Sequence, residues 1–169
     1  MKPDTYARLR ENVTAPSPLV SRIRLVNVYS VPRHYAAQTL YRLLAERPAA
    51  NRISHEAMPT RFQHERFIAC KPFRLWYLLE HDERVVGALE CTRLNEVGIA
   101  IFREHQGKGH ATEALKLFMA KHKPLRPIPA VRNGRWLANI ATGNEGSRAF
   151  FAKMGFEPLQ VTFALRREA

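Results

Sequence analysis

The stretch VGIAIFREHQGKGHATEAL, residues 97–115, decides the fold because three local patterns follow one another in it. Residues 97–102 form a short apolar run with β-branched side chains, which predicts a buried strand. Gly107 and Gly109 bracket Lys108 in a turn, and an amphipathic helix is expected over residues 107–121. The N–H groups and the positive dipole end of a helix's first turn favour an anion, so the sequence predicts a phosphate-binding turn.

This turn differs from two common nucleotide-binding loops. No Gly-x-x-x-x-Gly-Lys-Ser/Thr pattern fits it, and its glycines lack the Gly-x-Gly-x-x-Gly spacing of dinucleotide folds. It does fit the pattern Gln/Arg-x-x-Gly-x-Gly/Ala, with Gln106, Gly109 and Ala111 at the three defined positions. A second pattern, over residues 144–157, combines an initial Asn144, a short helix and a terminal Gly-Phe-Glu.

The two patterns together resemble the GNAT superfamily of acyl-CoA-dependent N-acyltransferases, over about residues 85–163. The resemblance implies an α/β single-domain fold with a mixed central sheet, splayed central strands and flanking helices. It also implies that acetyl-CoA, the acyl donor, lies between strand 97–102 and a strand at 136–142. Matching by position gives cofactor-binding roles to Ile99, Ala100, Ile101, Gln106, Gly107, Lys108, Gly109, His110, Ala111, Thr112, Asn144 and Phe151.

The residue at the usual position of the general acid differs from the pattern of the family. Many relatives have a Tyr seven residues after the Asn of the second pattern, placed to protonate the departing thiolate, and this chain has Phe151 there. Ser147 is the candidate acid that we assign to the catalytic site. Tyr77, a water molecule, or departure of the thiolate without a dedicated acid remain alternatives, because a thiol has a modest pKa.

Two carboxylates are candidates for the general base. Glu96 comes first, since some relatives carry a carboxylate near the start of this strand, and Glu90 on the preceding strand comes second. Asn139 stands where other relatives carry a Glu. His55 and His64 lie in the segment expected to cover the acceptor site; each is expected to be a surface or packing residue, and their spacing predicts no metal site.

Length and composition indicate one domain. The 169 residues are enough for a single core, and we expect an irregular arm over residues 1–20 followed by an acetyltransferase domain over residues 21–169. Without a signal-peptide pattern or a long apolar stretch, the chain is expected to be cytoplasmic, with no membrane partner. Cys70 and Cys91 lack metal or redox spacing and are expected to be buried thiols.

The net charge of +12 is unevenly distributed. Lys and Arg exceed Asp and Glu at both ends, whereas residues 61–120 are nearly balanced. A basic surface is typical of proteins that bind a polyanion in a salt-dependent way. Solvated Arg side chains and the negative charge of CoA itself explain the same excess, and no basic run with interleaved aromatic residues appears.

Periodicity predicts the remaining elements. Apolar spacing predicts strands at 23–29, 74–80, 85–92 and 156–165, and helices at 35–46, 58–70 and 144–154. The proline-rich residues 122–135 are expected to form an exposed loop.

The sequence therefore predicts an N-acetyltransferase that moves an acetyl group from acetyl-CoA to a primary amine of an unidentified acceptor. A basic nucleic-acid-binding or nucleic-acid-modifying protein on the same fold is one alternative. A catalytically degenerate CoA-binding module is another, and either a monomer or a homodimer is expected.

Overall fold

The computed structural model describes residues 22–48, 51 and 57–165; the expected arm over residues 1–20 and His55 lie outside them. Within this part of the chain, one antiparallel sheet has the strand order β1-β2-β3-β4. Its strands are β1 (Ile23–Asn27), β2 (Leu75–His81), β3 (Arg84–Cys91) and β4 (Val97–Ile101). The α-helices of the same residues are α1 (Arg33–Glu46), α2 (Arg61–Ala69), α3 (His110–Lys121) and α4 (Glu145–Lys153). Two short 3-10 helices, η1 (Val28–Ser30) and η3 (Arg103–His105), follow β1 and β4. The predicted α/β fold class is confirmed.

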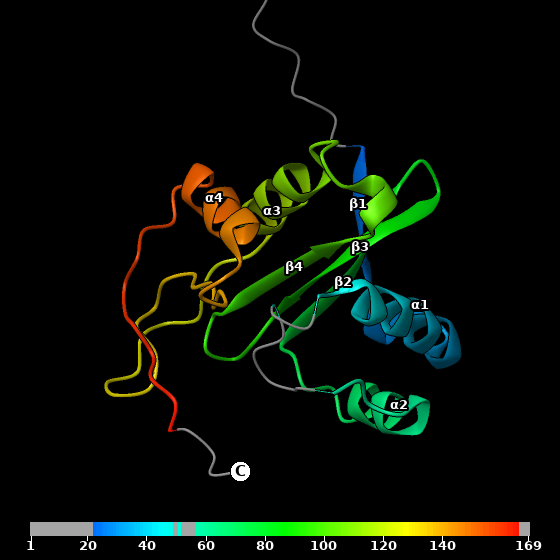
Figure 1. Ribbon diagram of the computed structural model, residues 1–169, viewed down its shortest axis with the longest axis horizontal. Coiled ribbons are helices and arrows are strands. Elements are labelled where there is room, and N and C mark those ends of the chain that lie inside the picture. Colours follow the sequence, from blue (N-terminus) through cyan, green and yellow to red (C-terminus); the bar gives the residue numbers. More distant parts are fainter. Residues whose placement is uncertain (1–21, 49–50, 52–56, 166–169) are drawn as a thin grey trace, which may run out of the picture.

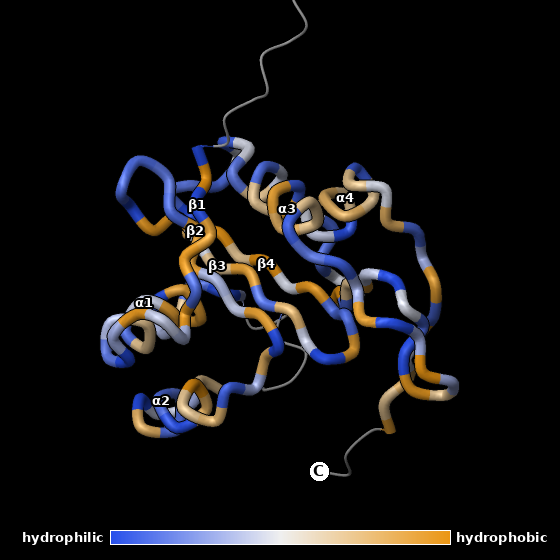
Figure 2. The backbone as a smooth tube through the Cα atoms, turned by 180° about the vertical axis from the view of Figure 1, so that it is seen from behind, coloured by the Kyte–Doolittle hydropathy of each residue, from blue (hydrophilic) through white to orange (hydrophobic). Residues whose placement is uncertain are grey.

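The helices cover both faces of the sheet, with α1 and α2 on one face and α3 and α4 on the other (Figure 1). Alternate side chains of a strand point to opposite faces, so β2 and β3 contribute to two separate cores. On the α3 side, Leu115 and Phe118 pack with Leu89. On the α1 side, Leu40 packs with Leu78. Hydrophobic residues are concentrated along the sheet, whereas the connection between β2 and β3 is hydrophilic (Figure 2).

Capping residues set the helix boundaries. Helix α2 begins at Arg61, later than the expected residue 58, because Thr60 and Gln63 form a capping box around its first turn. Helix α3 begins at His110, since Gly107 and Gly109 have φ angles of 74° and 84° and form the preceding turn. The apolar stripe expected on α3 does pack on the sheet.

Two expected strands are absent from the described residues. In the 136–142 segment, the only ladder contact is a parallel bridge from Leu137 to Glu96, so the sheet expected to be mixed is antiparallel in all of its named strands. Residues 156–165 form no strand, and the side chains of Val161 and Phe163 are 78% and 90% exposed. A strand needs a neighbour for its backbone hydrogen bonds and its apolar face; Phe156 packs its ring against Phe151, but residues 157–165 are exposed and pair with no strand.

Other expectations concern single residues and surfaces. Cys91 is buried as expected, whereas Cys70 is exposed because it follows the last turn of α2. The loop at 122–135 is confirmed as largely exposed. No helix in the described part of the chain has the length and apolarity needed to cross a bilayer.

A pair of phenylalanines tests this packing. Phe118→Ala should lower the free energy of unfolding by about 3–5 kcal/mol, because it empties a fully buried position between α3 and the sheet. Phe163→Ala should change it by less than about 0.5 kcal/mol, because that ring is exposed. Urea unfolding followed by circular dichroism measures both. A large loss in Phe163→Ala would mean that residues 156–165 pack in solution.

Candidate functional site

The connection from β4 to α3 forms a turn whose backbone is accessible. A Cβ atom placed on Gly107 or Gly109 would meet nothing within 4 Å, so both faces of the turn are open. Gly109 is the N-cap of α3, and no side chain caps the helix; the first intrahelical bond runs from the Glu113 N–H to the Gly109 carbonyl at 3.1 Å. The N–H groups of the first turn, which include His110, are therefore directed at the space where an anion would bind.

Charged and titratable side chains surround this turn. Lys108 is exposed at its tip, and His110 lies between His81 on β2 and His105 before the turn, with ring centroids 4.5 and 6.2 Å away. Burial, followed by repulsion from His81, His105 and Lys108, lowers the pKa of His110. The three imidazoles border a hollow of about 570 Å³ that also contacts Arg84. Lys108 and Arg84 contribute positive charge to this hollow, and Asp82, which also lines it, contributes negative charge.

The hydrogen-bond pattern of β4 identifies the residues that face its free edge. In an antiparallel pair, residues bonded to the partner strand alternate with residues whose backbone groups point away from it. The Phe102 N–H donates to the Val86 carbonyl of β3 at 3.0 Å, so the even-numbered residues of β4 face β3. The odd-numbered residues Val97, Ile99 and Ile101 therefore direct their backbone groups to the opposite edge.

That edge is paired only at its beginning. The Val97 N–H donates to the Leu137 carbonyl at 2.7 Å, and no further backbone bond joins β4 to residues 138–142 in the described structure. The Ile101 carbonyl accepts a bond from the Gln106 side chain at 2.9 Å, which ties the turn to the end of β4. The Ile99 N–H and carbonyl and the Ile101 N–H remain available to an extended ligand on this edge.

Ala100 is placed differently from the residues on either side. Its backbone faces Ala88 on β3, and its methyl group lies on the α1 face of the sheet, so only its small side chain is available to a ligand. Gln106 through Thr112, by contrast, are contiguous at the open turn. The structure thus brings together the expected cofactor residues from Ile99 to Thr112, with Ala100 in a separate orientation.

The three expected residues of α4 have separate environments. The Asn144 side chain accepts a bond from the Ser147 N–H at 3.1 Å and so caps the helix. Ser147 is partly exposed in the first turn. Phe151 is 6% exposed and packs its ring against Phe150 and Phe156, so its role in the described structure is in the core.

The carboxylate of Glu96 already has two hydrogen-bond donors. The Thr92 hydroxyl donates to one oxygen and the Asn139 amide to the other, each at 2.9 Å. The Asn139 bond links the start of β4 to the segment that follows Leu137. Sequence reasoning missed this pairing, because Thr92 and Asn139 carry no motif that associates them with Glu96.

Glu90 has a different environment. It lies opposite Gly98 on β4, and a Cβ atom on Gly98 would stand 2.2 Å from the Glu90 Oε1 atom. Burial raises the pKa of Glu90, and the positive charge of Arg47, at the end of α1, partly offsets this effect. The signal available in the sequence was the glycine at position 98, but only the strand register shows which side chain it accommodates.

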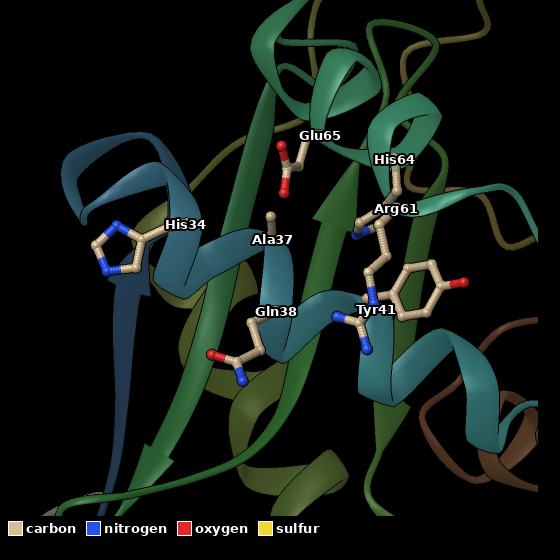
Figure 3. Close-up of a pocket in the computed structure, with 7 residues that line it drawn as sticks. All are labelled: His34, Ala37, Gln38, Tyr41, Arg61, His64 and Glu65. Carbon is tan, nitrogen blue, oxygen red and sulfur yellow. The ribbon is translucent and has the colours of Figure 1, made fainter.

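A small polar pocket of about 90 Å³ lies between α1 and α2 (Figure 3). His64 is 6% exposed, and its Nε2 atom has no hydrogen-bond partner among the described residues. The His64 ring packs edge-on against Tyr41, so the expectation of a packing role is confirmed. Burial lowers the pKa of His64, which keeps the imidazole neutral at pH 7.

Tyr77, an alternative acid, lies away from the turn. Its hydroxyl is 2.9 Å from the His122 Nε2 atom, just beyond the C-terminal end of α3, whereas the turn lies at the N-terminal end. Burial raises the pKa of Tyr77, which makes it a weaker proton donor. Among the described residues, no group of three or more His, Cys, Asp or Glu side chains has a metal-binding arrangement.

Known structures share this fold. An acetyltransferase from Thermus thermophilus superposes with a TM-score of 0.58 at 25% identity, covering 80% of this chain and 86% of that one. A spermidine N-acetyltransferase mutant from Vibrio cholerae gives 0.59 at 16% identity, with 83% and 82% covered. A ribosomal L7/L12 alpha-N-protein acetyltransferase in complex with coenzyme A gives 0.58 at 13% identity, with 80% of each chain covered.

At the sequence level, no curated protein matches the chain. Residues 27–157 match the family profile described as an acetyltransferase (GNAT) domain, which spans well over half of the chain. The chain therefore belongs to the GNAT family of acetyltransferases.

Proposed function

We propose that this N-acetyltransferase transfers an acetyl group from acetyl-CoA to a primary amine, with the diphosphate of the donor bound at residues 106–112. The observation that supports this most directly is the uncapped start of α3, preceded by two glycines around which a Cβ atom would meet nothing. Backbone N–H groups, the helix dipole and Lys108 together favour a diphosphate there.

The edge of β4 supplies the second half of the donor site. An extended pantetheine arm would pair with the free backbone groups of Ile99 and Ile101, as an added strand would. The same edge is connected to the turn by the short 3-10 helix Arg103–His105, so the arm and the diphosphate would occupy adjoining parts of one site. The Ile101 N–H would then hydrogen-bond the thioester carbonyl and stabilise the negative charge that develops on its oxygen.

The leaving thiolate needs little assistance. A thiol has a pKa of about 8.5, so the thiolate is a tolerable leaving group at neutral pH. We assign Ser147 as the group that helps to return a proton to it, because Phe151 has no proton to give and lies in the core. Asn144 is assigned to the pantetheine arm in addition to its capping role. We assign no step to a metal ion.

The acceptor is proposed only by class. Among the structural neighbours, one is a spermidine N-acetyltransferase and another is an alpha-N-protein acetyltransferase, and the acceptor of each is an amine. The basic ends of the chain leave nucleic-acid binding as a second candidate function, supported by the net charge of +12.

We also propose that the protein is located in the cytoplasm and that it is a monomer or a homodimer.

A pair of glycine variants tests the diphosphate site. Gly109→Val should weaken acetyl-CoA binding at least tenfold, about 1.4 kcal/mol, because its side chain would occupy the space of the diphosphate. Gly155→Val is a matched control: both glycines have a φ of 84° and open space around them, but Gly155 follows α4. Isothermal titration calorimetry measures both affinities. Equal losses in the two variants would point to backbone strain and contradict the site.

Turnover separates an enzyme from a degenerate module. Because the donor site would hold the thioester in place for attack, thiol release from acetyl-CoA should rise by about tenfold or more above the uncatalysed rate when a suitable amine is added. Spermidine, glucosamine and a peptide with a free α-amine are the amines to supply, and a thiol reagent follows the release. Tight acetyl-CoA binding without thiol release for any of these amines would favour the degenerate module.

Salt dependence tests the nucleic-acid candidate. A protein that neutralises about six to ten phosphates loses about 10³–10⁵ in DNA affinity between 50 and 200 mM salt. We expect no such tight, salt-sensitive binding, because the described basic residues form no continuous run with stacking aromatics. Fluorescence anisotropy with single-stranded and duplex oligonucleotides checks this, and submicromolar binding at low salt with that slope would favour the alternative.

A further inference from the structure

We propose that Glu90 on β3 is the general base that accepts the proton of the acceptor amine, and that Gly98 on β4 provides the space for its carboxylate. This inference rests on the proposed function, since it places a proton acceptor beside the same donor site. Sequence reasoning ranked Glu96 first, and the geometry reverses that order.

The strand register brings Glu90 across β4. Glu90 and Gly98 are direct partners in the β3–β4 ladder. A Cβ atom on Gly98 would lie 2.2 Å from Oε1 and 2.8 Å from Cδ of Glu90, closer than real contacts allow. The carboxylate therefore lies against the backbone of β4, and any residue other than glycine at position 98 would displace it.

This carboxylate lies on the face of the sheet that carries α1 and α2. Trp76, Glu90 and Gly98 form one cross-strand row, and Trp76 belongs to the core beneath α1. On that face β4 presents only Gly98 and Ala100 before Phe102, and both small residues are partly exposed. An amine can thus approach the edge of β4 across small side chains, with Glu90 next to its path.

The surroundings of Glu90 suit a proton acceptor. Its carboxyl group is largely desolvated, yet the residue keeps some exposure. Burial raises its pKa, so an ionised Glu90 binds a proton more tightly than a solvated carboxylate does. The groups that face it are Arg47 from α1, whose charge opposes the shift, its own backbone N–H, and the row neighbours Trp76 and Gly98. The Trp76 Nε1–H has no partner among the described residues.

Glu96 has a structural task instead. Its two carboxylate oxygens accept bonds from Thr92 and Asn139, which connect the start of β4 to the following segment. A proton taken up by Glu96 would weaken one of these bonds. Glu90 carries no such connection to a second segment through its carboxylate oxygens in the described structure, apart from its attraction to Arg47.

The proton balance of the reaction is complete with Glu90. The ammonium group of the acceptor gives one proton to Glu90, directly or through one water, and becomes a neutral amine. Its nitrogen forms a bond to the carbonyl carbon, the carbon–sulfur bond breaks, and the thiolate leaves with the electron pair. The nitrogen loses its second proton as the amide forms, and this proton passes to the thiolate. Glu90 then releases its proton to solvent.

The test compares Glu90→Gln with Glu96→Gln, using acetyl-CoA and the primary amine selected from spermidine, glucosamine and the peptide. Glu90→Gln should lower kcat by about 100-fold or more at neutral pH, while the calorimetric acetyl-CoA affinity stays within about twofold. Its kcat/KM should rise about tenfold per pH unit above neutrality, because only the free amine in solution then reacts. Glu96→Gln should retain the pH profile of the original chain.

The stability of Glu90→Gln provides a readout that a merely structural role would not give. A buried carboxyl with a raised pKa costs stability as the pH rises through that pKa, since the unfolded chain ionises it more easily. Removing the charge should therefore leave the Tm at alkaline pH unchanged or higher, while activity falls. A lower Tm together with a proportionate loss of acetyl-CoA binding would indicate a structural role and overturn the assignment.

Gly98→Ala gives an independent test, since its Cβ atom would push the carboxylate aside. It should lower kcat by about tenfold or more, with little change in acetyl-CoA affinity. Unchanged turnover in both Gly98→Ala and Glu90→Gln would refute Glu90 as the base. So would a changed pH profile of kcat/KM in Glu96→Gln alone. Failure of the original chain to bind acetyl-CoA would instead refute the proposed function.

Discussion

The pairing of β4 on only one edge is the constraint on which the rest of the site depends. Strand β3 forms backbone hydrogen bonds with the even-numbered residues along the whole of β4. Among the described residues, the opposite edge of β4 forms a backbone hydrogen bond to another segment at Val97 alone. An unpaired edge carries free donors and acceptors, which is costly when they are buried and useful when a ligand pairs with them. A short 3-10 helix, Arg103–His105, connects this edge to the turn before α3, so the free backbone groups of β4 and those of the helix N-terminus belong to one short stretch of chain.

Two sets of contacts keep the edge in this state. Asn95 is fully buried, and its side chain exchanges bonds with both backbone groups of Leu125, at 3.0 and 2.8 Å. Its carbonyl accepts the Leu137 N–H at 2.9 Å, so one residue fastens the loop and the following segment to the start of β4. On the other side, Leu115 and Phe118 of α3 pack against the sheet, and this packing fixes the position of the N-terminus of α3 relative to β4. These contacts fix the start of β4 and α3, whereas the backbone groups where the donor is proposed to bind are unpaired among the described residues.

Each carboxylate near β4 thus has a distinct environment. Glu96 is surrounded by donors and connects two segments, while Glu90 is desolvated and lies against a glycine. A desolvated carboxylate is unfavourable for folding, and such groups are characteristic of functional sites. The proton chemistry proposed for this enzyme follows from that contrast in environment rather than from the order of the residues in the chain.

The sequence by itself determined the glycine turn before α3, the apolar stripe of α3 and the family, because these depend on local spacing and on glycine conformations. It also determined that a short helix begins next to Asn144. It misjudged residues 136–142 and 156–165, since a strand forms only where another segment can pair with it. The tertiary structure alone decided which edge of β4 is free, that Glu96 is held by Thr92 and Asn139, and that Gly98 makes room for Glu90. These features arise from contacts between residues distant in sequence, and strand register, which local patterns do not encode, sets them.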